Sequence, residues 1–340
     1  MTPYDPVTTA RPGSTAQPDG QRFGTPGQRL SEQGMFTMKF HKTAAAAAAV
    51  LALAATAACG GKEGSAGDKP KDQTDEKALP TYEVAKDVEV DSAVLKKAQK
   101  RGKIVIGAKA DQPYLGFQDQ STKKYSGFDI EMAKMIAADL GFTPKQIEWK
   151  TVDSGARETT VSKGDVDLMI GTYTINDERK KQIDFAGPYF HAGASLLVRK
   201  DEKEVTGPES VKGKKVCSIV GSTPLQVIKK PKYGAEVTEL SKYSECVSQL
   251  LDGQVDAVTT DDAILMGYAA QNPGKLKVVG KPFSDEPYGV GLKKGDAALQ
   301  KAVADSIKKH EDNGDYKKAY DATLGKSGSK FQTPPEITEK

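Results

Sequence analysis

The sequence predicts an α/β fold organised as two similar lobes, each with a parallel sheet covered by helices. Short β-branched runs alternate with segments of helical period between residues 94 and 270, and this alternation is typical of parallel sheets. The pattern Gly-x-Val-Asp before an apolar strand occurs at 164–170 and again at 253–258, about 89 residues later. Each copy alone is also a common helix-to-strand turn. Two copies indicate two lobes that face each other across a cleft, where open α/β sheets bind ligands.

The predicted elements follow in order along the chain. A first helix ends at Gly102, and four apolar residues spaced from Ile130 to Leu140 predict a second helix that Gly141 ends. The predicted strands are the compact apolar runs 104–107, 147–152, 166–171, 215–220, 237–240 and 257–260. The predicted helices are 94–100, 128–140, 157–163, one beginning at Pro224, 244–251 and 263–270.

The amino-acid composition favours a protein that binds a small molecule over one that binds nucleic acid or a metal ion. Lys and Arg number 49 against 46 Asp and Glu in 340 residues, a net charge of +3, whereas a nucleic-acid-binding surface would be strongly basic. Three cysteines and three histidines, without metal-ligand spacing, predict no metal site. We therefore expect no cofactor, no nucleic-acid partner and no catalytic residue.

The N-terminal region resembles an export signal. Residues 1–34 lack apolar periodicity, residues 35–42 are basic, and an Ala-rich apolar run over 43–58 precedes Cys59. This order is typical of a secretory signal. The alternative, a transmembrane helix, needs about 20 strongly apolar residues. The small residues before Cys59 resemble a lipobox, which predicts that residues 1–58 are removed and that Cys59 is lipidated. Translation starts at Met1, Met35 or Met38 in this interpretation.

The polar segment that follows has no hydrophobic face, so residues 59–83 are expected to form the lipidated Cys59 and a flexible tether. Two acyl chains suffice for stable anchoring. The chain is therefore expected at the extracellular face of the cytoplasmic membrane.

Five segments resemble bacterial extracellular solute-binding proteins of family 3, in the family's order. They are GFDIEMA at 127–133, GDVDLMI with TINDERK at 164–180, IDFAGPYF at 183–190, VKGKKV at 211–216 and GST at 221–223. The resemblance implies a type II periplasmic-binding fold. It implies one lobe from 84–197 with 287–326, a second from 198–286, a hinge of crossing segments near 191–199 and 284–290, and a tail over 327–340.

The resemblance places a clamp for a ligand α-carboxylate at Arg179, helped by Thr172, Thr174 and Thr223. A guanidinium matches a carboxylate with two parallel donors. The alternative for Arg179 is a solvated helix charge in the run 177–181. Asp261 resembles the partner of the α-ammonium, while the adjacent Asp262 is a competing candidate or a helix N-cap.

The ligand side chain is expected to be acidic. Lys109 holds the position that reads this side chain in the family, and Arg157 with Ser154 matches acidic-amino-acid binders. With Arg179, three cations then face the single anion Asp261, which complements a dianionic, monocationic ligand. The alternative is that Lys109 and Arg157 pair with Asp111, Asp153 or Glu158.

Two further assignments complete the site. Tyr114 or Tyr173 is expected to cover the ligand, and we choose Tyr114. Phe117, nearby in the sequence, is expected to belong to the hydrophobic core instead. Cys217 and Cys246 are expected to form a disulfide inside the second lobe, since both would face an oxidising exterior. Two buried thiols are the alternative.

The implied function is the substrate-binding subunit of an ABC importer, a monomer that delivers glutamate, then aspartate, to a permease and its ATPase. The alternatives are a binder of another polar amino acid such as glutamine, a sensor that does not transport, and an enzyme like cyclohexadienyl dehydratase, which shares the fold. The chain has no second domain for other chemistry, so an enzyme is not expected.

Overall fold

The computed structural model describes residues 79–340. The predicted signal region, the lipidated Cys59 and most of the tether lie outside the described residues. Within the described part, no helix is long and apolar enough to cross a membrane.

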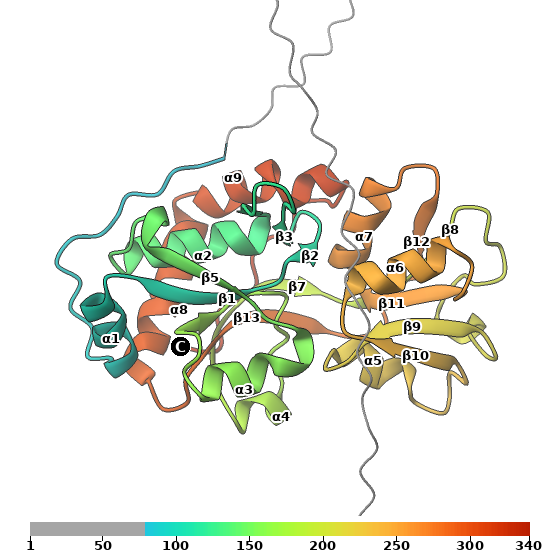
Figure 1. Ribbon diagram of the computed structural model, residues 1–340, viewed down its shortest axis with the longest axis horizontal. Coiled ribbons are helices and arrows are strands. Elements are labelled where there is room, and N and C mark those ends of the chain that lie inside the picture. Colours follow the sequence, from blue (N-terminus) through green and yellow to red (C-terminus); the bar gives the residue numbers. More distant parts are fainter. Residues whose placement is uncertain (1–78) are drawn as a thin grey trace, which may run out of the picture. The chain divides into compact units, whose positions relative to one another are not determined.

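The first lobe is built on a five-stranded sheet in the order β5-β1-β6-β13-β7 (Figure 1). Three strands are parallel, and β13 runs antiparallel to both β6 and β7. The sheet is therefore mixed rather than wholly parallel as predicted, because the chain returns from the second lobe in the opposite direction. The strands are β1 (Ile104–Ala108), β5 (Ile147–Thr151), β6 (Leu168–Met169), β7 (Asp184–Ala192) and β13 (Glu286–Leu292).

Helices cover this sheet, and capping residues set where they begin and end. Ser92 accepts the Leu95 N–H at the start of α1, and Gly102 ends the helix with a φ of 73°, a left-handed conformation that glycine adopts without strain. Neither of the two C-terminal helices was predicted from the sequence. The helices are α1 (Ala93–Arg101), α2 (Phe128–Asp139), α3 (Arg157–Ser162), α4 (Asp177–Lys180), α8 (Ala297–Asp312) and α9 (Asp315–Ala322).

The second lobe is also built on a five-stranded sheet, in the order β10-β9-β11-β8-β12. β10, β9 and β11 are parallel, and β8 pairs antiparallel with β11 and β12. Its strands are β8 (Ala194–Arg199), β9 (Lys215–Ile219), β10 (Glu236–Leu240), β11 (Ala257–Asp261) and β12 (Leu276–Val279). Its helices are α5 (Thr223–Ile228), α6 (Tyr243–Leu251) and α7 (Asp262–Gln271).

Two segments cross between the sheets. The first is Gly193, between β7 and β8, where a Cβ would lie 2.6 Å from Pro282 Cβ and 2.7 Å from Ser284 O. The second covers residues 280–285, between β12 and β13. Because the crossing segments touch at this point, glycine is required there. The predicted lobe boundary between residues 197 and 198 falls inside β8.

Short elements not assigned from sequence fill the connections. A three-stranded antiparallel sheet consists of β2 (Asp111–Gln112), β3 (Gly116–Gln118) and β4 (Tyr125–Ser126). Single 3₁₀ turns lie at η1 (Pro144–Gln146), η2 (Ser154–Ala156), η3 (Pro208–Ser210) and η4 (Leu324–Ser327).

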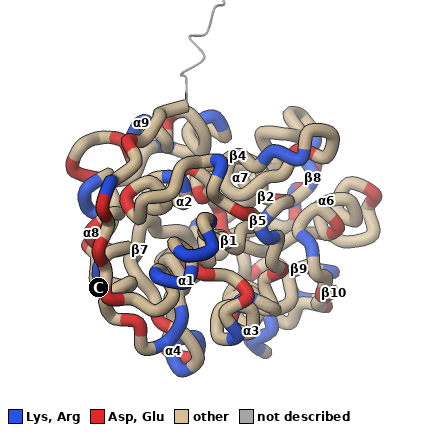
Figure 2. The backbone as a smooth tube through the Cα atoms, turned by 60° about the vertical axis from the view of Figure 1, so that its left-hand side comes forward, with Lys and Arg blue, Asp and Glu red and all other residues tan. Residues whose placement is uncertain are grey.

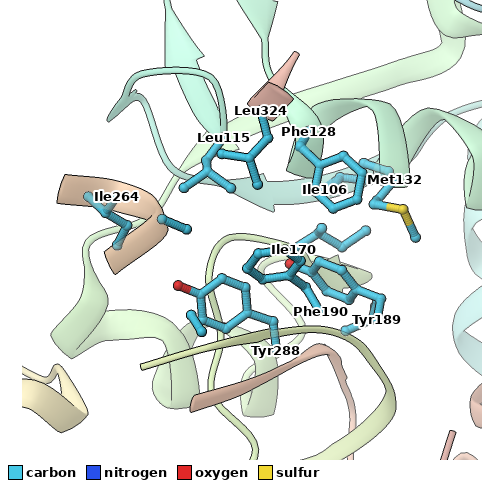
Figure 3. Close-up of a cluster of buried hydrophobic side chains, with 14 of the residues drawn as sticks. Ile106, Leu115, Phe128, Met132, Ile170, Tyr189, Phe190, Ile264, Tyr288 and Leu324 are labelled. Atoms are coloured by element: carbon cyan, nitrogen blue, oxygen red, sulfur yellow. The ribbon is translucent and has the colours of Figure 1, made fainter. Parts of the chain in front are cut away.

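One hydrophobic core continues from the first lobe into α7 of the second. Figure 3 shows Ile264 of α7 in the same cluster as Phe128, Tyr189 and Tyr288. All four side chains are buried, which removes their apolar surface from water. The lobes are therefore joined near the hinge by packing as well as by two chain crossings. At the C-terminus, Glu339 forms a β-bridge with Gly187.

Candidate functional site

The predicted site residues come from the ends of strands in both lobes. Lys109 follows β1, Thr172 and Thr174 follow β6, and Asp261 ends β11. Thr223 begins α5 after β9. The carboxyl ends of parallel strands lie on one edge of a sheet, so each lobe presents its polar residues on the edge that faces the other lobe.

Lys109 is a buried cation without a carboxylate contact. Its side chain is 2% exposed, and Nζ donates to Val152 O and to Ser154 Oγ, both at 3.2 Å. Burial lowers the pKa of Lys109 to about 8; the positive charge of Arg157 acts in the same direction, while the charges of Asp111 and Asp153 oppose the shift. Among the described residues, no carboxylate forms an ion pair with Lys109. A buried ammonium with only neutral acceptors needs an anion.

Arg157, like Lys109, has only neutral hydrogen-bond acceptors, and all of them are backbone carbonyls. Its guanidinium donates to Ser154 O at 3.1 Å, Gly171 O at 3.2 Å, Thr172 O at 3.0 Å and, in the second lobe, Gly221 O at 3.3 Å. The group stacks 4.3 Å above the ring centre of Tyr173. Neither Asp153 nor Glu158 pairs with it in the described structure, so the alternative of a local ion pair does not apply to Arg157.

Arg179, in contrast, already has a carboxylate partner. Its Nε lies 3.0 Å from Glu158 Oε1, Nη1 donates to Thr174 O at 2.6 Å and Nη2 donates to Gly221 O at 2.9 Å. Burial and the neighbouring Arg157 lower the pKa of Arg179 to about 10. The alternative of a solvated helix charge is therefore wrong, since Arg179 is 6% exposed.

Thr172 belongs to the interior of the first lobe. Its backbone N–H donates to Asp129 Oδ2 at 2.9 Å, and its hydroxyl exchanges hydrogen bonds with the Gln112 amide. Its φ of 43° is left-handed, a strained conformation for a β-branched residue. The structure thus brings Thr172 beside the site through its carbonyl, which Arg157 binds, and not through its hydroxyl.

Thr174 and Thr223 meet across the lobes at a residue that the sequence analysis missed. Both hydroxyls donate to Glu286 Oε2, the Thr174 bond at 2.8 Å, and Ser284 Oγ donates to Oε1 at 2.7 Å. Glu286 is 1% exposed and begins β13. The only sequence signal was its position inside the predicted second crossing segment, 284–290.

Asp261 is a buried carboxylate with one oxygen free. Oδ2 accepts the Tyr288 hydroxyl at 2.6 Å, and Oδ1 has no hydrogen-bond partner among the described residues. Burial raises the pKa of Asp261 well above its usual value, and the charge of Glu286 adds to this. Asp262 instead accepts the Gly193 and Ala263 N–H groups, so it belongs to the hinge.

Of the two candidate aromatic residues, Tyr173 lies beside other predicted site residues: its ring contacts the guanidinium groups of Arg157 and Arg179. Tyr114 has a φ of 65° and lines a different pocket of about 320 Å³ with Pro113, Phe117 and residues of α7 and η4. Tyr114 is therefore not brought together with the other predicted site residues.

The lobes are closed on one another in this structure. Besides the Arg157 and Arg179 bonds to Gly221 O, a Cβ on Gly221 would lie 2.4 Å from Gly155 Cα in the first lobe. Asp111 of the first lobe also binds the start of α6 in the second. The backbones touch, which explains how the site is shielded from water.

The charge balance differs from the predicted ratio of three cations to one anion. Glu286 and Glu158 add two carboxylates, so three cations face three anions. Their distribution is uneven, however. Lys109 and Arg157 have no anionic contact, whereas Asp261 and Glu286 have no cationic contact among the described residues. The site thus has an unneutralised positive end and an unneutralised negative end.

Other chemistry in the described residues is limited. Cys217 and Cys246 are joined by a disulfide, with their Cα atoms 5.6 Å apart. Within residues 79–340, no group of three or more His, Cys, Asp or Glu side chains is arranged to hold a metal ion. Figure 2 shows basic and acidic positions interspersed, for example along α8.

Comparisons with known proteins agree with this fold. The glutamine-binding protein GlnH of an ABC transporter from Bacillus subtilis is 43% identical over 218 residues, 64% of this chain and 80% of that protein. The glutamate-binding protein GluB from Corynebacterium efficiens is 36% identical over 253 residues, 71% of this chain and 86% of that protein. Both are named for the amino acid they bind.

Solved structures show the same architecture. An ancestral arginine-binding protein bound to glutamine is 38% identical, with a TM-score of 0.62, covering 66% of this chain and 99% of that chain. The model of the bacterial extracellular solute-binding proteins, family 3, matches residues 104–326. This span includes both sheets and every predicted ligand residue, and the chain therefore belongs to that family.

Proposed function

We propose that this protein binds glutamate between its lobes and delivers it to a membrane permease. It is the solute-binding protein of an amino-acid ABC importer, as its relatives are, and works outside the cytoplasm. The relatives leave the cargo open, because one is named for glutamine and another for glutamate.

One observation carries the choice of glutamate. Lys109 and Arg157 are both buried, lie close enough for each charge to affect the other, and hydrogen-bond only neutral acceptors. Two adjacent buried cations without an anion are costly. A side-chain carboxylate that reaches both would neutralise the positive end with charge-assisted hydrogen bonds.

The other groups of an amino acid fit the remaining residues. Asp261 Oδ1 lacks a donor and would accept the α-ammonium. Arg179 has a planar guanidinium at the interlobe contact and would bind the α-carboxylate with Thr223 at the start of α5. A molecule with two carboxylates and one ammonium therefore complements both ends of the site.

Glutamine is the alternative cargo. The GlnH relative is the more identical of the two, and an amide oxygen can accept hydrogen bonds from Lys109 and Arg157. Glutamine leaves their two charges unneutralised, however, so we place glutamate first and aspartate, whose shorter side chain reaches less far, second.

The setting follows from the same proposal. Cys59 anchors the protein by lipid to the outer face of the cytoplasmic membrane, and the Cys217–Cys246 disulfide forms after export. The partners are a permease and, through it, an ATPase. The protein acts as a monomer without turnover, which separates it from a dehydratase, and release to a permease separates it from a sensor.

Calorimetry of the purified chain against the twenty amino acids tests the proposal. The expected result is micromolar or tighter binding of glutamate, weaker binding of aspartate and glutamine, and no conversion of the bound amino acid. Tightest binding of glutamine, arginine or lysine would overturn the assignment of the cargo and leave the family unchanged.

A further inference from the structure

Glu286 joins the two lobes and the second crossing segment through one buried carboxylate. Oε2 accepts the hydroxyls of Thr174 in the first lobe and Thr223 in the second. Oε1 accepts the Ser284 hydroxyl, and Ser284 Oγ in turn accepts the Ala194 N–H at 2.9 Å. The carboxylate thus bonds to a residue of each lobe and to Ser284 of the second crossing segment.

The hydrogen bonds to Glu286 use the only proton of each threonine hydroxyl. A threonine hydroxyl carries one proton, and a carboxylate can only accept. While Thr174 and Thr223 both donate to Glu286, neither can donate to a carboxylate of the bound amino acid. The residues that the family resemblance assigns to the ligand α-carboxylate are therefore already engaged by a carboxylate of the protein itself.

Glu286 also acts on Arg179 as a ligand carboxylate would, through its negative charge. Its negative charge raises the pKa of Arg179 against the effect of burial, so it lies within reach of the guanidinium expected to bind the ligand. It is buried and makes no ion pair among the described residues. Any ligand carboxylate placed near the two hydroxyls would meet a like charge.

We propose that Glu286 is an internal competitor of the cargo: its carboxylate occupies the hydroxyl donors of the ligand α-carboxylate and links the lobes through them. The inference rests on the proposed function, because it needs an amino-acid carboxylate at Arg179 and Thr223. When the cargo enters, Glu286 releases the two hydroxyls, and this release reduces the net affinity.

Two consequences distinguish this role from that of a ligand partner. Removing the charge of Glu286 strengthens cargo binding, because the hydroxyls become available without competition. The same change weakens the contact between the lobes, because the Thr174–Glu286–Thr223 bridge loses its charge-assisted bonds.

The first experiment compares Glu286→Gln with the unaltered protein by calorimetry. The expected result is about 10-fold tighter binding of glutamate, equivalent to roughly 1.4 kcal/mol. Asp285→Asn is the matched control, since it removes one negative charge from the adjacent residue, whose side chain is 76% exposed and contacts His191 rather than the hydroxyls. Weaker or unchanged binding by Glu286→Gln would overturn the proposal, and equal tightening by Asp285→Asn would show a general charge effect and overturn it too.

The second experiment measures lobe separation in ligand-free protein by small-angle X-ray scattering. Glu286→Gln and Thr223→Val each weaken the Thr174–Glu286–Thr223 bridge, so both are expected to increase the radius of gyration. Asp285→Asn leaves the bridge intact and is expected to leave the radius unchanged. If Glu286→Gln fails to fold, Thr223→Val still tests the bridge. An unchanged radius in the folded variants would contradict it.

These measurements separate the inference from the proposed function. If the unaltered protein bound no amino acid, the proposed function would fail, and so would the competition, whereas scattering would still report on the bridge. If the protein bound glutamine best, only the choice of cargo would fail, because glutamine has the same α-carboxylate.

Discussion

Asp111 in the first lobe accepts the backbone N–H of Tyr243, the first residue of α6 in the second lobe, at 2.8 Å. The same Oδ2 accepts the Ser244 N–H at 3.3 Å. The positive end of a helix favours a carboxylate, and here the carboxylate comes from the opposite lobe. The contact exists only while the lobes are closed.

Asp111→Asn is therefore expected to weaken glutamate binding by about 10-fold, since hydrogen bonds to a charged group contribute roughly 1.5–3 kcal/mol. Thermal unfolding of the ligand-free protein should change little, because the contact joins lobes rather than holding one together. Asp177→Asn, an exposed residue of the first lobe, is the control for titration calorimetry. Equal affinities of Asp111→Asn and the unaltered protein would show that the contact does not contribute to closure.

Gly221 is expected to be essential for closure. A methyl group there would lie 2.4 Å from Gly155 Cα of the other lobe, so Gly221→Ala should reduce glutamate affinity by about 100-fold or more, because the backbones could no longer touch. Binding is measured by calorimetry, with folding checked by circular dichroism.

Two substitutions serve as controls for Gly221→Ala. Gly213 has a similar positive φ of 69° but no atom within 4 Å of the added Cβ, so Gly213→Ala reproduces the backbone strain without the contact. Gly155→Ala places its Cβ at an ordinary 3.4 Å from Val220. If Gly213→Ala lost as much affinity as Gly221→Ala, strain and not the contact between lobes would be the cause.

Lys109→Met should change the cargo preference. It retains a similar volume but removes the charge, so glutamate binding is expected to fall by about 100-fold and glutamine binding by about 10-fold or less, because only glutamate loses a buried ion pair. Lys103→Met, at an exposed lysine paired with Glu148, is the control in competition calorimetry. An equal loss for both ligands would remove Lys109 from the site that reads the side chain.

The affinity for glutamate should fall as the pH rises through about 8, where Lys109 loses its proton in the ligand-free protein. A bound carboxylate favours the protonated amine, so binding takes up a proton above that pH, with a limiting slope of about 10-fold per pH unit. Calorimetry at pH 7 and pH 9 in buffers of different ionisation enthalpy measures both effects. Lys109→Met should lack them.

Ligand-free stability should change in the opposite direction. The pKa of Lys109 in the folded protein is below the ordinary 10.5, so the unfolded chain binds this proton more tightly between about pH 8 and pH 10.5. The contribution of Lys109 to the free energy of unfolding therefore rises with pH in that window. Comparison with Lys109→Met, by urea titration, isolates this contribution.

Removing the disulfide should lower stability more than affinity. Cys217 and Cys246 are 29 residues apart in the sequence, and closing a loop of that length contributes about 3.5 kcal/mol in the chain-entropy model. The double variant Cys217→Ala with Cys246→Ala is expected to show this loss in urea unfolding while still binding glutamate. An equally stable double variant would mean that the cysteines act only as buried apolar residues.

Periodicity in the sequence determined the α/β class and the position of most helices and strands up to residue 270, because the spacing of apolar residues depends on local geometry alone. The family resemblance located Lys109, Arg157, Arg179, Thr223 and Asp261, which follow strands or begin helices. Their type and position along the chain were sufficient to identify them as candidates.

Tertiary structure alone decided how those residues are partnered. The antiparallel return of β13 places Glu286 between Thr174 and Thr223, residues 112 and 63 positions away. The fold also places Tyr114 in a different pocket and leaves Lys109 without an ion pair among the described residues. Sequence patterns report which face of an element is buried, whereas the neutralisation of a charge depends on residues from distant segments that meet only when the lobes close.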